Sequence, residues 1–303
     1  NLDDLINMIE STKVRKNSTP RERRTLRRLL PSLKELQKMV GMDNIKKDIV
    51  DMILYYIQGL DDNQNMMHTI IEGPPGTGKT TIGKIIGKIY LEMGFLSTSK
   101  FRIAKRNDFI GGYLGQTAIK TNDLLEECTG GVLFIDEAYS LGNPEGRDSY
   151  AKEAIDMLNQ FLSENKKDFV CIIAGYKDSL DNSFFNMNHG LRRRFPWKYT
   201  IEPSTGEQLY HIFNKQVIDQ NWELKSDIKF DFFETNKDYF KHNGGDTENF
   251  LQKCKISHSK RIFTSEEVQR SKLLILEDLN IALESHKENY KKKEETQIPH
   301  MYI

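Results

Sequence analysis

The sequence predicts an α/β fold, in which a parallel sheet is flanked by helices, followed by a small all-helical lid domain. Three short apolar runs carry this prediction, because each has the length of a buried strand and each ends at a polar or glycine-rich turn. These runs are Thr69–Ile71, Val132–Ile135 and Phe169–Ala174. Apolar residues recur at helical spacing between the runs, and at helical spacing alone after Pro203. Alternating strands and helices imply a parallel sheet covered by helices, and the later stretch implies the lid.

The remaining elements follow from similar patterns. A helix is predicted over about residues 45–57, with Asp43 or Asn44 as its cap. Phe101–Ala104 and Trp197–Ile201 are further strand candidates. A last apolar helix is predicted over about Leu273–Leu283, and the charged tail after it is expected to fray.

Four parts are predicted along the chain. They are a charged, mainly helical extension at 1–39, the α/β domain at 40–202, the helical domain at 203–285 and a charged tail at 286–303. Basic residues crowd the extension up to Arg28, and leucines follow at helical spacing interrupted by Pro31. The extension is either a basic arm for nucleic acid or an acidic partner, or a solvated helix face. We favour the solvated face, because charge runs usually are just that.

Composition limits the classes of function. The 303 residues carry 44 basic and 44 acidic side chains, so no net charge favours nucleic acid or an anionic membrane. The longest apolar run is too short to cross a bilayer, and Asn1 begins nothing like a signal peptide. Cys128, Cys171 and Cys254 are far apart and show neither metal spacing nor a disulfide framework. We expect a soluble, intracellular protein, in the cytoplasm.

A glycine-rich segment between the first strand and a helix has the pattern of a phosphate-binding loop. The pattern G-x-x-x-x-G-K-[ST] is matched by Gly73, Gly78, Lys79 and Thr80. Its glycines let backbone N–H groups converge on a polyphosphate, and the helix N-terminus adds partial positive charge. A chance match in this length is on the order of one in a hundred. The predicted nucleotide-binding residues are Gly73, Pro74, Pro75, Gly76, Thr77, Gly78, Lys79, Thr80 and Thr81.

Two carboxylates complete the predicted site. Asp136 and Glu137 directly follow the apolar run Val132–Ile135, at the carboxyl end of a buried strand. Lys79 would reach the β- and γ-phosphates, while Thr80 and Asp136 would hold Mg²⁺. Glu137 would orient and deprotonate the attacking water. A strand-to-helix cap would explain Asp136 alone, but not its presence together with the phosphate loop.

The assembled motifs resemble those of the AAA+ ATPases, and in detail the group containing red-type rubisco activase and stage V sporulation protein K. The resemblance covers about residues 40–285 and implies ATP and Mg²⁺ as cofactors. It is specific for the superfamily and much less so for a biological task, since one fold hosts many functions. The segments that carry it are GPPGTGKT at 73–80, GGVLFIDEAYSL at 130–141, IIAGYKDSL at 172–180 and NHGLRRRFP at 188–196.

The resemblance also implies an adenine pocket and a pore loop. Val40 and Gly41, with Met42, would line the adenine pocket. Tyr113, Leu114 and Gly115 resemble an aromatic-hydrophobic-glycine loop that grips a polypeptide threaded through a ring. Such aromatic side chains supply apolar contact without sequence preference. The alternative is that Tyr113 packs against the sheet.

An arginine finger follows from the same resemblance. Arg194, immediately before Phe195, matches the position of the finger in the family, and Arg192 is a second candidate. A guanidinium from a neighbouring subunit would meet the charge on the γ-phosphoryl oxygens, an effect of about 10³- to 10⁵-fold in related phosphoryl transfer. This requires a homo-oligomeric ring, expected to be a hexamer. The alternative is that some of the three consecutive arginines pair with surface acids.

Two positions depart from the common family pattern. The first sensor of the γ-phosphate is often Asn, and Tyr176 aligns near that place. The second sensor is often an arginine, which NGGDTENFL at 243–251 lacks. That segment instead resembles the G-A-D-x-x-N pattern of the protein-unfolding branch. The resemblance therefore places Gly245, with Gly244 and Asp246, near the adenosine.

The leading hypothesis is Mg²⁺-dependent ATP hydrolysis in a ring, coupled to remodelling or threading of an unidentified protein client. The alternative is a nucleic-acid-stimulated motor or loader that uses the arginines of the extension. The zero net charge and the aromatic loop favour a protein client. A third hypothesis, a nucleotide switch without useful turnover, is favoured only by the two sensor departures.

Overall fold

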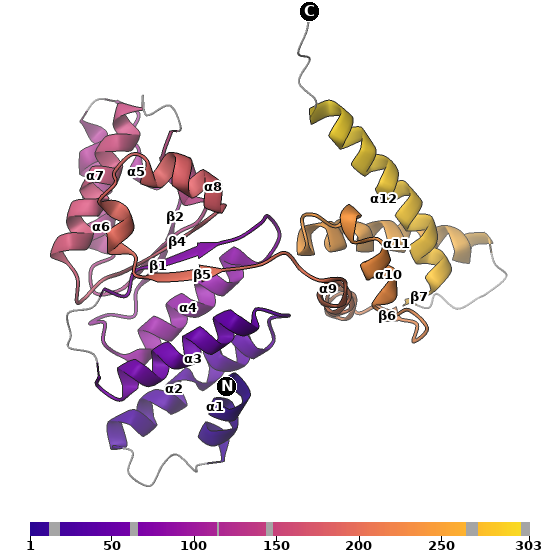
Figure 1. Ribbon diagram of the computed structural model, residues 1–303, viewed down its shortest axis with the longest axis horizontal. Helices are drawn as coiled ribbons and strands as arrows, with labels where there is room; N and C mark the ends of the chain where they lie inside the picture. The colour runs from indigo at the N-terminus through magenta and orange to yellow at the C-terminus, as the bar shows by residue number, and fades with distance from the viewer. Residues whose placement is uncertain (12–18, 61–65, 114, 144–147, 265–271, 298–303) are drawn as a thin grey trace, which may run out of the picture. The chain divides into compact units, whose positions relative to one another are not determined.

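A computed structural model describes residues 1–11, 19–60, 66–113, 115–143, 148–264 and 272–297 (Figure 1). Its contacts divide the chain into two units. The α/β unit comprises Asn1–Gly73 and Gly78–Glu202, and the helical unit comprises Pro74–Thr77 and Pro203–Ile303. Among the described helices, none combines the length and the apolar composition needed to span a membrane.

A five-stranded parallel sheet forms the centre of the α/β unit and confirms the predicted fold class. The strand order is β2-β3-β4-β1-β5, with β3 paired to β4 and β4 paired to β1. The loops that leave β3, β4 and β1 therefore lie beside one another at one edge of the sheet. The strands are β1 (Thr69–Glu72), β2 (Phe101–Ala104), β3 (Val132–Ile135), β4 (Val170–Gly175) and β5 (Trp197–Thr200).

Helices cover both faces of this sheet (Figure 1). Strand side chains alternate between two buried clusters, so Phe134 and Ile172 face one set of helices while Leu133 and Ile173 face the other. Helices α1 (Leu2–Glu10), α2 (Pro20–Gln37), α3 (Asp43–Ile57) and α4 (Lys79–Met93) form the first set. The second set contains α5 (Arg106–Phe109), α6 (Gln116–Glu127), η1 (Ala138–Leu141), α7 (Ser149–Glu164), α8 (Lys177–Ser179), η2 (Leu180–Phe185) and η3 (Leu191–Arg194).

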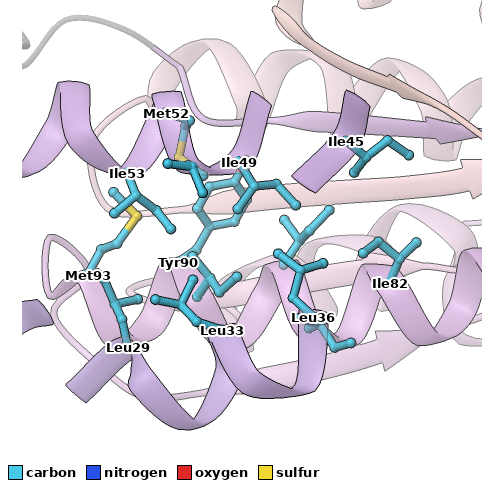
Figure 2. Close-up of a cluster of buried hydrophobic side chains, with 14 of the residues drawn as sticks. Leu29, Leu33, Leu36, Ile45, Ile49, Met52, Ile53, Ile82, Tyr90 and Met93 are labelled. Atoms are coloured by element: carbon cyan, nitrogen blue, oxygen red, sulfur yellow. The ribbon is translucent and has the colours of Figure 1, made fainter. Parts of the chain in front are cut away.

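The N-terminal extension is part of the α/β unit. Figure 2 shows leucines of α2 packed with isoleucines of α3 and with Tyr90 of α4, and Leu29, Leu33 and Leu36 are fully buried. The leucine stripe therefore forms one face of the core, and the arginines remain on the outer face. The sequence indicated an interruption at Pro31, but Pro31 lies inside α2 and the helix continues through it.

Helix α3 starts at Asp43, but the predicted side-chain cap is wrong. The cap position is Met42, whose backbone is left-handed with φ 61°, and neither Asp43 nor Asn44 caps the helix through a side chain. The turn into α3 is instead made by the backbone of Gly41 and Met42, since Gly41 also has a positive φ of 67°.

The helical unit has an aromatic core of its own. Phe213, Phe233, Phe240 and Phe250 are buried there and contact one another through their rings. Its elements are α9 (Gly206–Asp219), β6 (Glu223–Leu224), α10 (Asp231–Thr235), η4 (Lys237–Tyr239), α11 (Gly244–Thr264), β7 (Leu273–Leu274) and α12 (Leu276–Gln297).

Two predictions about this unit were wrong. Strands β6 and β7 pair in parallel, so the unit is not all-helical. Helix α12 starts at Leu276 and continues to Gln297, through the stretch that was expected to fray. It continues because His286 is buried in the aromatic core, with its ring stacked on Phe240 at 5.1 Å between centroids and its Nε2 2.9 Å from the Tyr239 carbonyl.

Candidate active site

The loop between β1 and α4 has the backbone that phosphate binding requires. Gly76 and Gly78 have φ values of 71° and 87°, in a region that is costly for other residues. Helix α4 begins at Lys79, so the N–H groups of its first turn have no partner within the helix and lie beside the loop. Such an N-terminus attracts anions. The predicted loop thus has the local structure of an anion-binding site.

Close packing places this helix start beside the acid pair. A Cβ atom built on Gly83 of α4 would lie 2.7 Å from the ring of Phe134 on β3. Only a residue without a side chain allows α4 to approach the strand this closely. The first turn of α4 and the end of β3 therefore lie next to each other.

Thr80 and Asp136 are joined by a hydrogen bond. The Thr80 hydroxyl donates to Oδ2 of Asp136 at 2.7 Å, and the Glu137 backbone N–H donates to Oδ1 at 3.1 Å. A hydroxyl and a carboxylate are hard oxygen ligands of the kind that Mg²⁺ takes, and Mg²⁺ usually completes its shell with waters and substrate phosphates. Among the described residues, no group of three or more His, Cys, Asp or Glu side chains could hold a metal ion.

Lys79 lies inside the loop. Its Nζ donates to the Gly73 carbonyl at 2.9 Å and lies 4.4 Å from the centroid of the Tyr176 ring. Burial lowers the pKa of Lys79, and the charges of Glu137 and Asp136 act in the opposite direction. The ammonium group is therefore close to both carboxylates and to the loop that would hold the phosphates.

Glu137 combines a strained backbone with a raised pKa. Its φ is 54°, which is uncommon for a residue with a side chain and is often found at functional sites. Burial raises the pKa of Glu137, Asp136 raises it further, and Lys79 lowers it. A carboxylate whose pKa is moved toward neutral pH is a better general base.

The predicted adenine-pocket segment borders the phosphate loop. Gly41 and Met42 both have positive φ, which turns the chain between α2 and α3. The terminal methyl groups of Met39 and Met42 would lie 3.3 and 3.7 Å from a Cβ atom built on Gly78. Val40 belongs to the same turn. Met39 was not predicted, because nothing in its sequence surroundings distinguishes it from a core methionine.

The three consecutive arginines have different surroundings. Arg192 pairs with Asp181 and lies over the Phe185 ring, with 4.4 Å from its guanidinium carbon to the centroid. Arg193 is exposed. Arg194 is half-buried, and its Nε is buried without a hydrogen-bond partner among the described residues. Arg192 is therefore engaged within its own chain, in the surface pairing that the sequence left as an alternative.

The candidate pore loop has a fixed base and an exposed tip. The Thr117 hydroxyl accepts a hydrogen bond from the Gly111 N–H at 3.1 Å, and the Thr121 hydroxyl donates to the Phe109 carbonyl at 3.1 Å. Tyr113 is 75% exposed, so it does not pack against the sheet. Gly115 ends the loop with a φ of 81°, and Leu114 lies outside the described residues.

Within the helical unit, the loop tip contacts the segment that contains Gly245. The Gly244 N–H donates to the Gly76 carbonyl at 3.1 Å. Asn243 donates from Nδ2 to the Pro75 carbonyl at 3.2 Å, and its Oδ1 accepts from the Ser204 N–H at 2.8 Å. Asn243 was not predicted as a site residue. Its positive φ of 49° and its burial become visible only in the structure.

Arg106 is a further residue that the sequence did not indicate. Its guanidinium donates to the carbonyls of Ser140 and Leu141 at 2.7 and 3.2 Å, and to the Asp148 carboxylate at 2.6 Å. It thereby connects α5 to the segment that follows Glu137. No motif marks it, because it is one basic residue among 44.

The fold and this site define the class of protein. A glycine loop between strand and helix, a lysine and threonine at the helix start, and an acid pair on the neighbouring strand end are the parts of a P-loop nucleoside triphosphatase. Residues 69–199 match the family described as "ATPase family associated with various cellular activities (AAA)". The chain belongs to this AAA family of ATPases.

Related proteins confirm the resemblance to the group that contains rubisco activase and stage V sporulation protein K. The cfxQ-like protein R730 of Acanthamoeba polyphaga mimivirus is 38% identical over 100% of this chain and 76% of its own length. Stage V sporulation protein K of Bacillus subtilis is 31% identical over 82% of this chain and 81% of its own. The chloroplastic ribulose bisphosphate carboxylase/oxygenase activase of Cyanidioschyzon merolae is 30% identical over 76% of this chain and 82% of its own.

A solved structure agrees with the fold. The FIGL-1 AAA domain, determined in complex with ADP, superposes with a TM-score of 0.58 at 17% identity, over 85% of this chain and 89% of that one. At this identity the likeness concerns the fold alone.

Proposed function

We propose that the chain assembles into a homo-oligomeric ring, a hexamer, that hydrolyses ATP with Mg²⁺ and uses the energy to remodel or thread a protein client. The observation that carries the catalytic part is the arrangement of Thr80, Asp136 and Lys79 around the glycine loop. The hydroxyl, the carboxylate and the ammonium are each fixed by a hydrogen bond of 2.7 to 2.9 Å.

Each residue of the loop then has a role. Backbone N–H groups of the loop and of the first turn of α4 bind the phosphates, and Lys79 balances their charge. Thr80 and Asp136 would hold the Mg²⁺ ion, which would neutralise negative charge on the phosphates. Glu137 takes a proton from the attacking water. The oxygen of that water bonds to the γ-phosphorus as the bond between the γ-phosphorus and ADP breaks.

A finger from a neighbouring subunit would complete the site. We propose Arg194 for this role, because Arg192 is held by Asp181 while the Nε of Arg194 has no hydrogen-bond partner among the described residues. Adenosine would lie against Val40 and Gly41.

Two observations support a protein client. Tyr113 extends from a fixed base into solvent, as a residue that grips a chain must. The activase of Cyanidioschyzon merolae acts, by its name, on an enzyme and hence on a protein. The alternative client is nucleic acid, and the exposed arginines Arg21, Arg24 and Arg27 on α2 favour it.

The test uses two variants of the site. Glu137→Gln should bind ATP with normal affinity and hold an assembled, unhydrolysed state, whereas Lys79→Ala should lose ATP binding. Normal turnover by Glu137→Gln would contradict the mechanism. Light scattering with and without ATP measures the assembly.

A second pair of assays tests the client. ATPase activity with and without nucleic acid, at two salt concentrations, separates the two clients, because nucleic-acid stimulation would fall steeply with salt. Capture of a client by Glu137→Gln, but not by Glu137→Gln with Tyr113→Ala, supports threading.

A further inference from the structure

Tyr176 lies between the two halves of the candidate site, which are the phosphate loop and the acid pair. It directly follows β4, and β4 lies between β3, which ends at the acid pair, and β1, which ends at the phosphate loop. The Gly73 N–H donates to the Gly175 carbonyl at 3.3 Å, which ties the start of the loop to the end of β4. A side chain at position 176 is therefore positioned to contact both halves.

The Tyr176 ring contacts Lys79. The Lys79 Nζ lies 4.4 Å from the ring centroid, within the range of a cation–π interaction. The Tyr176 ring also stacks on the ring of Tyr139, with centroids 5.2 Å apart and planes inclined by 24°. Tyr139 follows Glu137 by two positions, so the stack connects the ring that contacts Lys79 to the segment of the acid pair.

Gly175 leaves room beside the Tyr139 ring. A Cβ atom at this position would lie 3.0 Å from Cδ1 of Tyr139 and 3.0 Å from the Leu180 side chain. The Ser183 hydroxyl also donates to the Tyr139 carbonyl at 3.0 Å. Tyr139 is thus fixed through its backbone carbonyl, while its ring lies beside Gly175 and stacks on Tyr176.

From this arrangement we propose that Tyr176 is a positioning residue, whose ring face seats the Lys79 ammonium over the phosphate loop. The inference rests on the proposed ATP binding at this loop. A ring face attracts a cation without carrying a charge, so the ammonium can stay over the ring while it contacts the phosphates, and ATP binding need not order the lysine side chain.

This role differs from sensing of the γ-phosphate. A sensor would act through the Tyr176 hydroxyl and would change the rate of hydrolysis. A seat acts through the ring and changes ATP affinity. Tyr176→Phe keeps the ring and removes the hydroxyl, whereas Tyr176→Leu removes the ring, so the two variants separate the roles.

The experiment measures binding of a non-hydrolysable ATP analogue with Mg²⁺, and single-turnover hydrolysis at saturating ATP. Tyr176→Leu should raise the dissociation constant about three- to tenfold, the loss expected for a cation–π contact. Tyr176→Phe should restore it to within about twofold of the wild-type value. Tyr150→Leu, at a half-buried tyrosine on α7, is the matched control. Melting temperatures verify that all variants are folded.

Two outcomes would contradict the positioning role of Tyr176. One is a Tyr176→Phe variant that binds the ATP analogue as weakly as Tyr176→Leu, and the other is a Tyr176→Leu variant with wild-type affinity. If Lys79→Ala abolishes binding while Tyr176→Leu does not weaken it, only the seat fails. If the wild-type chain and Lys79→Ala bind equally poorly, the proposed function fails together with the seat.

Discussion

Thr80 and Asp136 are 56 positions apart in the chain, and the hydroxyl of Thr80 donates to the carboxylate of Asp136 at 2.7 Å. The contact exists because α4 packs closely on β3, where Gly83 leaves room for the ring of Phe134. The same contact brings together two hard oxygen atoms, of the kind that Mg²⁺ takes, at a helix N-terminus of the kind that attracts anions. The candidate site and the fold therefore depend on the same packing.

Substitution of Thr80 should reduce the dependence on magnesium. Thr80→Val keeps the shape of the side chain but removes the oxygen, and we expect turnover to fall by about 10²-fold or more, because charge stabilisation by a metal contributes several kcal/mol. ATP affinity should also become insensitive to chelation of Mg²⁺. Thr80→Ser, which keeps the oxygen, is the control. Equal magnesium dependence in Thr80→Val and wild type would contradict the assignment.

Mixing experiments can identify the arginine finger. Arg194→Ala should retain ATP binding and lose about 10³-fold or more of turnover. If the finger acts on a neighbouring subunit, mixing Arg194→Ala with Glu137→Gln should restore part of the activity, because some interfaces then pair an intact Glu137 with an intact Arg194. Arg193→Ala is the matched control. A larger loss in Arg193→Ala than in Arg194→Ala would transfer the role to Arg193.

The residues of the candidate site were easier to predict from the sequence than the residues that hold the surrounding segments in place. Lys79 and Thr80 were predictable because the phosphate-loop pattern fixes their types and their spacing from glycines, and Asp136 and Glu137 because they directly follow a continuous apolar run. Arg106 was not, since its partners are two backbone carbonyls and Asp148, and a carbonyl leaves no signal in a sequence.

Strands were likewise easier to predict than helix ends. A buried strand requires a continuous apolar run, and each of the three strongest runs became a strand. Helix ends depend on tertiary contacts. Pro31 is tolerated in α2, whose leucines are buried in the core on both sides of it, and α12 continues past Leu283 where His286 enters an aromatic core.

Arg106 should be sensitive to replacement by lysine. An ammonium group cannot reproduce the fork that donates to two carbonyls and a carboxylate. We expect Arg106→Lys to lower the free energy of unfolding by about 1.5–3 kcal/mol, the range for hydrogen bonds to a charged group. Arg102→Lys is the control, because Arg102 and Asp108 form an exposed pair at 3.2 Å that should contribute less than about 1 kcal/mol. Chemical denaturation measures the free energy of unfolding of both variants. Equal losses would contradict a role of Arg106 in holding α5 to the segment that follows Glu137.

Gly83→Ala tests the close packing of α4 on the sheet. Alanine favours the helix by about 1 kcal/mol over glycine. Its methyl group would, however, lie 2.7 Å from the buried Phe134 ring and 3.3 Å from Ile71. Overpacking of this kind costs about 1–3 kcal/mol, so we expect a net loss of stability and a weaker affinity for ATP. Gly112→Ala, where a Cβ atom would meet nothing within 4 Å, should be nearly neutral. A stabilised Gly83→Ala variant would show that the helix can move away from the strand.

His68 should make stability fall in acid. It is fully buried, its Nδ1 accepts from the Cys171 N–H at 3.1 Å, and burial lowers its pKa to about 4. The unfolded chain takes up this proton near pH 6.5, so between pH 6.5 and 4 the unfolded state binds more protons and stability falls as pH falls. A gap of about 2.5 pKa units corresponds to about 3 kcal/mol, all of it present above pH 6.5.

Replacement of His68 isolates this contribution. His68→Asn keeps an acceptor near the Cys171 N–H and removes the titrating ring, so its free energy of unfolding should vary less between pH 7 and pH 4 than that of the wild-type chain, by up to about 3 kcal/mol. His211→Asn, at an exposed histidine, should follow the wild-type profile. Urea denaturation at several pH values provides the comparison. Parallel profiles for His68→Asn and wild type would show that other groups control the acid sensitivity, because a neutral buried imidazole cannot be removed without flattening the curve.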